Sequence, residues 1–155
     1  MTQLFISLPV ADLERSNAYY SALGFAQNPA MSDHNGTCFV IEEGHSYFMV
    51  IAREFFQTFT ERPIVELAGQ VWGAMIVYLE SRDAVDARIA DGLAAGGRET
   101  QEPSDYGFMY QRQLTDPDGH VLEFGWMDPD AANAEAEAAA TAAATATTTT
   151  TAEQA

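Results

Sequence analysis

Apolar residues recur along the chain with two different periods, and the two periods alternate in a fixed order. Leu4–Val10 is rich in β-forming side chains and predicts a strand. Apolar positions at helical spacing follow, and they end at Gly24, a residue type that commonly terminates helices. Turn-like segments then separate three short runs that predict strands at 25–31, 37–42 and 47–52. The first third of the chain therefore predicts the order βαβββ.

The second half of the chain repeats this order. A strand is predicted at 72–80, and an apolar helical face follows it between Ser81 and Gly96. Further strands are expected at 98–102, 108–115 and 121–126. Glycine landmarks correspond between the halves: Gly24 with Gly97, and Gly44 with Gly119. We therefore expect an α+β fold in which two βαβββ modules form curved mixed sheets around a cleft.

The chain divides into one folded domain and a tail. We expect the domain at 1–130, with modules at about 3–53 and 71–128 and a connector at 54–70. The remaining residues, 131–155, form an Ala/Thr-rich, low-complexity tail. Asp128 and Pro129 can begin a helix there, but β-branched threonines weaken it further on. Because this helix lacks a large apolar face, we expect a frayed or disordered appendage.

Two stretches of sequence carry a family resemblance. The first runs from Leu8-Pro-Val-Ala-Asp-Leu13 through Tyr19-Tyr20 to Leu23-Gly24-Phe25, and the second is Asp116-Pro-Asp-Gly-His-Val-Leu-Glu-Phe124. Together with the duplicated order, they resemble the vicinal oxygen chelate superfamily over about residues 3–128. That superfamily includes glyoxalases, extradiol dioxygenases, fosfomycin-modifying enzymes and bleomycin resistance proteins. The resemblance implies the fold, whereas the superfamily hosts several unrelated chemistries.

The resemblance also implies where a catalytic metal would bind. Metal-dependent members place His on the first strand of a module and Glu or His on its last strand. The corresponding positions here are Phe5, Ala74 or Met75, Phe48 or Met49, and Glu123. Only Glu123 is a ligand for hard divalent ions. We therefore expect no cofactor, with a divalent metal in a rebuilt site as the alternative.

Large side chains take the place of the missing ligands. Phe5, Phe48 and Met75 suit an apolar cleft for a planar or hydrophobic compound, although such residues also serve as core fillers. Tyr106, Tyr110 and Arg112 are the candidates for orienting a ligand, while Arg112 can instead pair with a surface acid.

Glu123 has two open interpretations. If it faces the cleft among apolar neighbours, it is the candidate catalytic acid or base. If Arg112 or a tyrosine satisfies it, it is a structural carboxylate. Cys38 is the single cysteine, so no thiolate zinc site can form.

Charge narrows the range of partners. The chain has 23 acidic and seven basic residues, all of them arginine, which gives a net charge of −16. Such a chain repels nucleic acid and anionic membranes and attracts cations. There is no secretory signal and no run of about 18 apolar residues, so we expect a cytoplasmic protein that does not enter the membrane.

We therefore predict a metal-independent small-molecule-binding protein of this superfamily, with a cationic or aromatic ligand. The resemblance implies a homodimer and drug or xenobiotic sequestration, as in bleomycin resistance proteins. The alternative is an enzyme of the lactoylglutathione-lyase or dioxygenase type, with a rebuilt metal site that uses Glu123.

Overall fold

Two βαβββ modules follow each other in the chain, as the sequence predicts. The computed structural model describes residues 2–67 and 69–152, with side chains to residue 141. The first module comprises β1 (Leu4–Val10), α1 (Leu13–Ala22), β2 (Ala26–Asn28), β3 (Gly36–Glu42) and β4 (Ser46–Ala52). The strand expected at 25–31 is shorter than predicted, because a 3-10 turn, η1 (Pro29–Met31), begins where proline has no N–H to donate.

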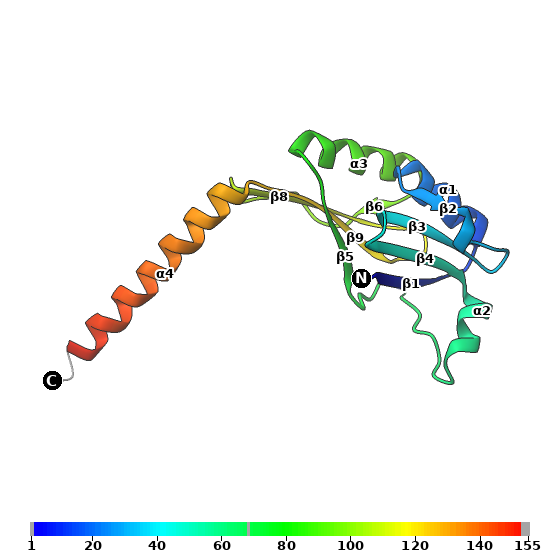
Figure 1. Cartoon of the computed structure of the whole chain (residues 1–155), viewed down its shortest axis with the longest axis horizontal. Helices are drawn as coiled ribbons and strands as arrows, with labels where there is room; N and C mark the ends of the chain where they lie inside the picture. Colours follow the sequence, from blue (N-terminus) through cyan, green and yellow to red (C-terminus); the bar gives the residue numbers. More distant parts are fainter. Residues whose placement is uncertain (1, 68, 153–155) are drawn as a thin grey trace.

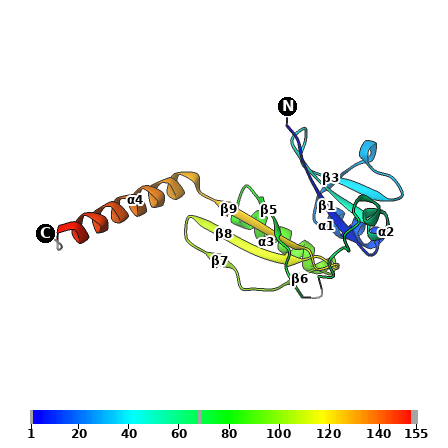
Figure 2. The same cartoon turned by 90° about the horizontal axis from the view of Figure 1, so that it is seen from below.

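The second module has one more strand than the first. It comprises β5 (Ala74–Tyr78), α3 (Arg82–Ala94), β6 (Arg98–Glu99), β7 (Ser104–Asp105), β8 (Met109–Thr115) and β9 (Val121–Met127). The strand expected at 98–102 stops after two residues, and β7 pairs separately with β8. The α+β architecture with curved mixed sheets is confirmed (Figures 1 and 2).

The two sheets share one topology. Their strand orders are β1-β4-β3-β2 and β5-β9-β8-β6. In each, the first and last strands of the module pair in parallel and the remaining neighbours are antiparallel. Each helix begins at a capping side chain: Asp12 accepts a hydrogen bond from the backbone N–H of Arg15 at 2.9 Å, and Ser81 accepts one from that of Ala84 at 3.1 Å.

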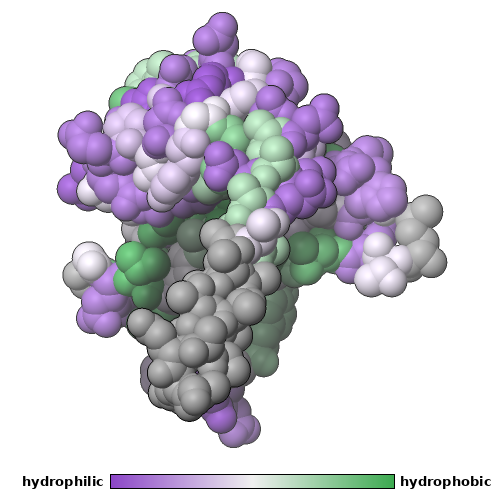
Figure 3. All heavy atoms as spheres, turned by 90° about the vertical axis from the view of Figure 1, so that its left-hand side faces the viewer, coloured by the Kyte–Doolittle hydropathy of each residue, from purple (hydrophilic) through white to green (hydrophobic). Residues whose placement is uncertain are grey.

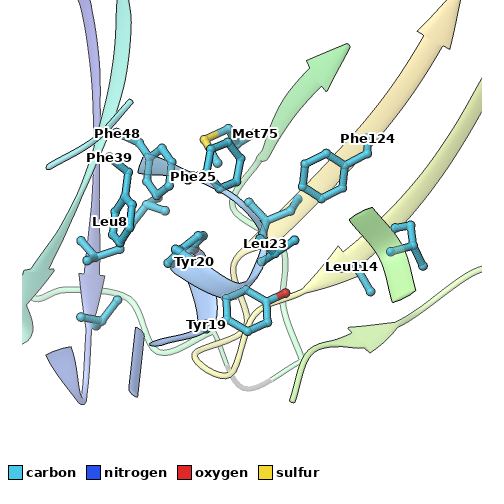
Figure 4. Close-up of a cluster of buried hydrophobic side chains, with 14 of the residues drawn as sticks. Leu8, Tyr19, Tyr20, Leu23, Phe25, Phe39, Phe48, Met75, Leu114 and Phe124 are labelled. Atoms are coloured by element: carbon cyan, nitrogen blue, oxygen red, sulfur yellow. The ribbon is translucent and has the colours of Figure 1, made fainter. Parts of the chain in front are cut away.

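A shared aromatic core joins the modules. Helices α1 and α3 lie on the same side of the sheets (Figure 1). Tyr20 of α1 packs against Phe48 at 4.9 Å between ring centroids, and Phe25 reaches Phe124 of the second module at 6.4 Å. Figure 4 shows these rings pointing toward one another from both modules. The opposite face of each sheet is therefore left free for other contacts.

The connector and the tail differ from the sequence prediction. The connector opens with helical turns, α2 (Arg53–Phe56) and η2 (Gln57–Phe59), and it ends only where β5 begins. The tail forms a 24-residue helix, α4 (Pro129–Ala152), where frayed or disordered chain was expected. Alanine is the best helix former, and its excess carries the helix through the threonine run.

Helix α4 extends away from both sheets (Figures 1 and 2). Asp128 accepts hydrogen bonds from the backbone N–H groups of Asp130 and Ala131, so the helix start follows the predicted cap. Among the helices in the described part of the chain, none has both the length and the hydropathy to cross a membrane.

Candidate functional site

Two neighbouring cavities lie against the face of the first sheet that α1 and α3 leave free. Ser7 is exposed on β1, between Ile6 and Leu8, which pack in or against the core. Because strand side chains alternate, Ser7 points to the opposite face. Both cavities include Ser7 in their walls. They therefore form two compartments of one groove.

The larger compartment, of about 590 Å³, lies where the two modules and the connector meet, and we call it the junction pocket. Its walls come from the end of β1, from residues 53–67 of α2 and the connector, from Trp72 and from the β8–β9 turn. Apolar side chains such as Phe56, Pro63 and Leu67 line it together with two arginines, Arg53 and Arg62. This mixture suits an apolar ligand with a polar end.

His120 is a buried wall residue of the junction pocket. It is only 3% exposed, whereas His45, its counterpart after the first-module glycine, is exposed. Its Nδ1 accepts a hydrogen bond from Trp72 Nε1 at 3.3 Å, so the ring proton lies on Nε2, which donates to the Pro9 carbonyl at 2.9 Å. His120 thus fixes the half-exposed indole of Trp72 at the pocket.

Asp116 organises the turn that carries His120. This carboxylate is buried and accepts hydrogen bonds from the Tyr20 hydroxyl at 2.8 Å and from the backbone N–H groups of His120 and Asp118. Burial raises its pKa above the ordinary range of an aspartate. The Asp116-Pro-Asp-Gly-His motif indicated the turn. The motif could not indicate the hydrogen bond with Tyr20, because the two residues are 96 positions apart in the sequence.

The smaller compartment, of about 410 Å³, lies on the free face of the first sheet, and we call it the sheet pocket. Met49 and Ile51 form its floor, and Phe55 and Phe59 form part of its wall. The two phenylalanine rings meet edge to face at 5.1 Å. Phe59 is 59% exposed, so the connector presents an aromatic surface to this compartment.

The residues predicted to line an apolar cleft lie elsewhere. Phe48 and Met75 are buried in the core, on the helix side of their sheets. Phe5 faces away from the helices, stacks on Tyr47 at 5.0 Å and remains 37% exposed. None of these three residues lines either compartment of the groove.

The residues predicted to orient a ligand are also outside the groove. Tyr110 and Arg112 lie four and two residues before the core residue Leu114, so strand alternation turns them toward α3. There the Tyr110 hydroxyl donates to Asp86 at 2.8 Å, and Arg112 pairs with Asp86 and Glu99 at 2.7 and 2.8 Å. Tyr106 is 60% exposed on the loop before β8.

Glu123 lies on the free face of the second sheet. It alternates with the core residues Leu122 and Phe124 and is adjacent to Ile76 in the parallel register. Its Oε1 accepts a hydrogen bond from Gln111 Nε2 at 2.9 Å. The partner is therefore an amide on the neighbouring strand rather than Arg112 or a tyrosine.

The positions that bind metal in the superfamily do not fit a metal here. The free sheet faces carry Phe5, Met49, Ala74 and Glu123, since Phe48 and Met75 point into the core. Of these, only Glu123 offers an oxygen ligand, and one carboxylate cannot hold a divalent ion tightly. Among the residues that the structure describes, no three His, Cys, Asp or Glu side chains form a group that could hold a metal ion.

Comparison with known proteins agrees with the duplicated fold. Residues 2–42 match the family model described as bleomycin resistance protein-like N-terminal. A hypothetical protein from S. aureus superposes with a TM-score of 0.68 at 24% identity, over 81% of this chain and 94% of that one. A glyoxalase/bleomycin resistance protein/dioxygenase family enzyme from Burkholderia phytofirmans superposes with a TM-score of 0.64 at 18% identity, over 80% and 97% of the two chains.

A third solved structure has a name that includes a ligand class. TnmS3, an antibiotic-binding protein from a Streptomyces species, superposes with a TM-score of 0.59 at 18% identity, over 83% of this chain and 97% of that one. Identities this low establish the fold and leave the ligand open. No curated protein matches the chain significantly.

The fold and the groove define a two-module α+β protein whose sheets each keep one face free of α1 and α3. The duplicated βαβββ order agrees with the vicinal oxygen chelate fold, the solved structures share that fold, and residues 2–42 are similar to the bleomycin resistance protein-like N-terminal model.

Proposed function

We propose that the protein binds an apolar or aromatic small molecule in the two-compartment groove, without a catalytic metal, and so sequesters a drug or xenobiotic. The observation that carries the proposal is the groove itself, whose two compartments measure about 590 and 410 Å³. Ligand pockets are typically apolar clefts of this size with a few polar groups. The likeness to an antibiotic-binding protein supports this proposal.

The proposal predicts binding that is independent of metal. The dye N-phenyl-1-naphthylamine, an uncharged planar compound, should bind with equal affinity in EDTA and with added zinc, nickel or manganese. Metal analysis should find well under one metal ion per chain, because in the described part of the chain no three His, Cys, Asp or Glu side chains group around one point. About one ion per chain, or binding that requires metal, would support the enzyme alternative with Glu123.

A matched pair of variants locates the binding. Ser7→Trp places a large side chain where both compartments meet, so we expect dye affinity to fall at least about tenfold through overpacking of the site. Ser21→Trp makes the same change on exposed helix α1 and should leave dye binding unchanged. Equal binding by both variants would contradict the groove as the site.

We further propose a homodimer, as the resemblance implies. The free face of the second sheet exposes Ile76, Tyr78 and Met127. Figure 3, which views the molecule from the side of α4, shows hydrophobic surface below the hydrophilic upper part. Exposed apolar surface is a common feature of interaction sites.

The dimer is tested by light scattering on the purified chain. The wild type should have twice the chain mass of 16.9 kDa, and Ile76→Glu should shift the protein toward the monomer, because it buries an unpaired charge in the interface. Leu93→Glu, an equivalent change at an exposed residue of α3, should leave the dimer intact. A wild-type monomer would overturn this proposal.

A further inference from the structure

The charges around the junction pocket differ from those of the chain as a whole. The chain has only seven basic residues, yet Arg53 and Arg62 both line this pocket. The acids in the same wall are Glu66 and Asp118. Each of these acids is paired: Glu66 with Arg53 at 2.6 Å, and Asp118 with Arg15 at 3.0 Å.

Asp118 also accepts hydrogen bonds from groups of the first module. It accepts hydrogen bonds from the Ala11 backbone N–H at 2.9 Å and from the Ser16 hydroxyl at 3.3 Å, and its side chain is only 9% exposed. Arg53 is similarly occupied, since it also donates to the carbonyls of Ile64 and Val65. These groups therefore have little capacity left for a ligand.

Arg62 is the remaining charge of the pocket wall. Within the described residues, its guanidinium has no ion pair, and Glu61 beside it in sequence does not line the pocket. The Arg62 backbone is held by two hydrogen bonds: its carbonyl accepts one from Gln57 Nε2, and its N–H donates one to Thr60 Oγ1. Among the described residues, the pocket wall thus offers one cation without an ion pair, carried on an anchored backbone next to apolar side chains.

We propose that the junction pocket selects a planar apolar compound that carries an anionic group, such as a carboxylate or sulfonate, with Arg62 as its partner. This inference rests on the proposed function and adds the ligand's charge to it. The net charge of −16 favours a cationic ligand instead. Arg62, however, lies in the pocket wall itself, whereas the effect of exposed acids farther away than the Debye length, about 8 Å at physiological salt, is largely screened.

The other side chains of the pocket wall indicate an aromatic, apolar body for the ligand. Trp72 is 54% exposed and fixed by His120, so it presents an indole surface to a planar ring. Phe56, Pro63 and Leu67 supply apolar contacts. An aromatic body with one acidic substituent satisfies both the indole and the guanidinium.

Two dyes with the same skeleton test the inference. N-phenyl-1-naphthylamine is uncharged, and 1-anilinonaphthalene-8-sulfonate adds one sulfonate to it. We expect the wild type to bind the sulfonate more tightly, and Arg62→Gln to weaken sulfonate binding by about three- to tenfold while the uncharged dye is unaffected. Arg62→Lys should retain most of the preference because it keeps the charge.

Arg98→Gln is the matched control. Arg98 is exposed on β6, lies outside both compartments and has the same charge. If Arg62→Gln and Arg98→Gln affect the sulfonate equally, or if the planar cation proflavine binds more tightly than the sulfonate, the inference is overturned. If neither naphthyl dye binds, or if Ser7→Trp does not abolish the binding, the proposed function itself fails.

Discussion

Replacing Phe48 by alanine is expected to lower the free energy of unfolding by about 4 kcal/mol, because it leaves a large cavity in the shared core. Phe48 has no exposed surface and packs against Tyr20, Phe25 and Phe39 at centroid distances of 4.9, 5.0 and 5.1 Å. Urea unfolding followed by circular dichroism measures the loss. The sequence analysis predicted that Phe48 lines the ligand cleft. A large loss of stability in Phe48→Ala would therefore support its place in the core instead.

Phe59→Ala provides the matched control. Phe59 is mostly exposed and lines the sheet pocket, so its loss should cost about 1 kcal/mol or less while weakening dye binding. The two phenylalanines should therefore separate stability from binding. A Phe48→Ala protein that loses less than about 1 kcal/mol would show that the ring does not belong to the core.

Asp116→Ala is expected to cost about 2–3 kcal/mol, because it leaves the buried Tyr20 hydroxyl and a buried N–H without partners. Its carboxylate accepts bonds from Tyr20, His120 and Asp118, and it joins the first module to the second. Asp33 accepts two backbone N–H bonds in an exposed turn, so Asp33→Ala should cost about 1 kcal/mol or less. Equal costs for the two variants would contradict a special role for burial.

Asp116→Asn separates the hydrogen bonds from the charge. Burial raises the pKa of Asp116 in the folded state, so the folded protein holds this proton more tightly than the unfolded chain. The protonated carboxyl therefore contributes to the free energy of unfolding. This contribution is fully present below the pKa of the unfolded chain, about 3.9 for aspartate, and it is lost as the pH rises through the pKa of the folded state. The unfolding free energy of Asp116→Asn relative to wild type should therefore rise with pH above about 4. A difference that stays flat would contradict the raised pKa.

Local patterns predicted the modules well. The caps Asp12 and Ser81 and the helix end at Gly24 depend on interactions within a few residues, which a sequence pattern can register. The end of β2 before Pro29 also depends on a local interaction, but the prediction missed it. The predicted strand at 25–31 included this proline. Existence and order of elements were therefore more predictable than their ends.

The sheet faces were harder to assign because one residue of register reverses them. Counting four residues after each turn glycine equates Phe48 with Glu123, but Phe48 faces the core and Glu123 the free face. The hairpins differ: Glu42 pairs with Ser46 across the first turn and Thr115 with Val121 across the second, and β3 has an irregularity after Val40. Such a shift exchanges the two faces of a strand. Met49 is consequently the first-module counterpart of Glu123.

The groove was not predictable from either module alone. Its walls combine β1, the connector and the β8–β9 turn, and its buried histidine depends on contacts with Pro9 and Trp72. The sequence by itself determined the two βαβββ modules and which residue types stand on their strands, because short-range periodicity and residue chemistry are local properties. Only the tertiary structure decided which side chains meet in the groove and which charge remains unpaired there, because those depend on contacts between residues far apart in the chain.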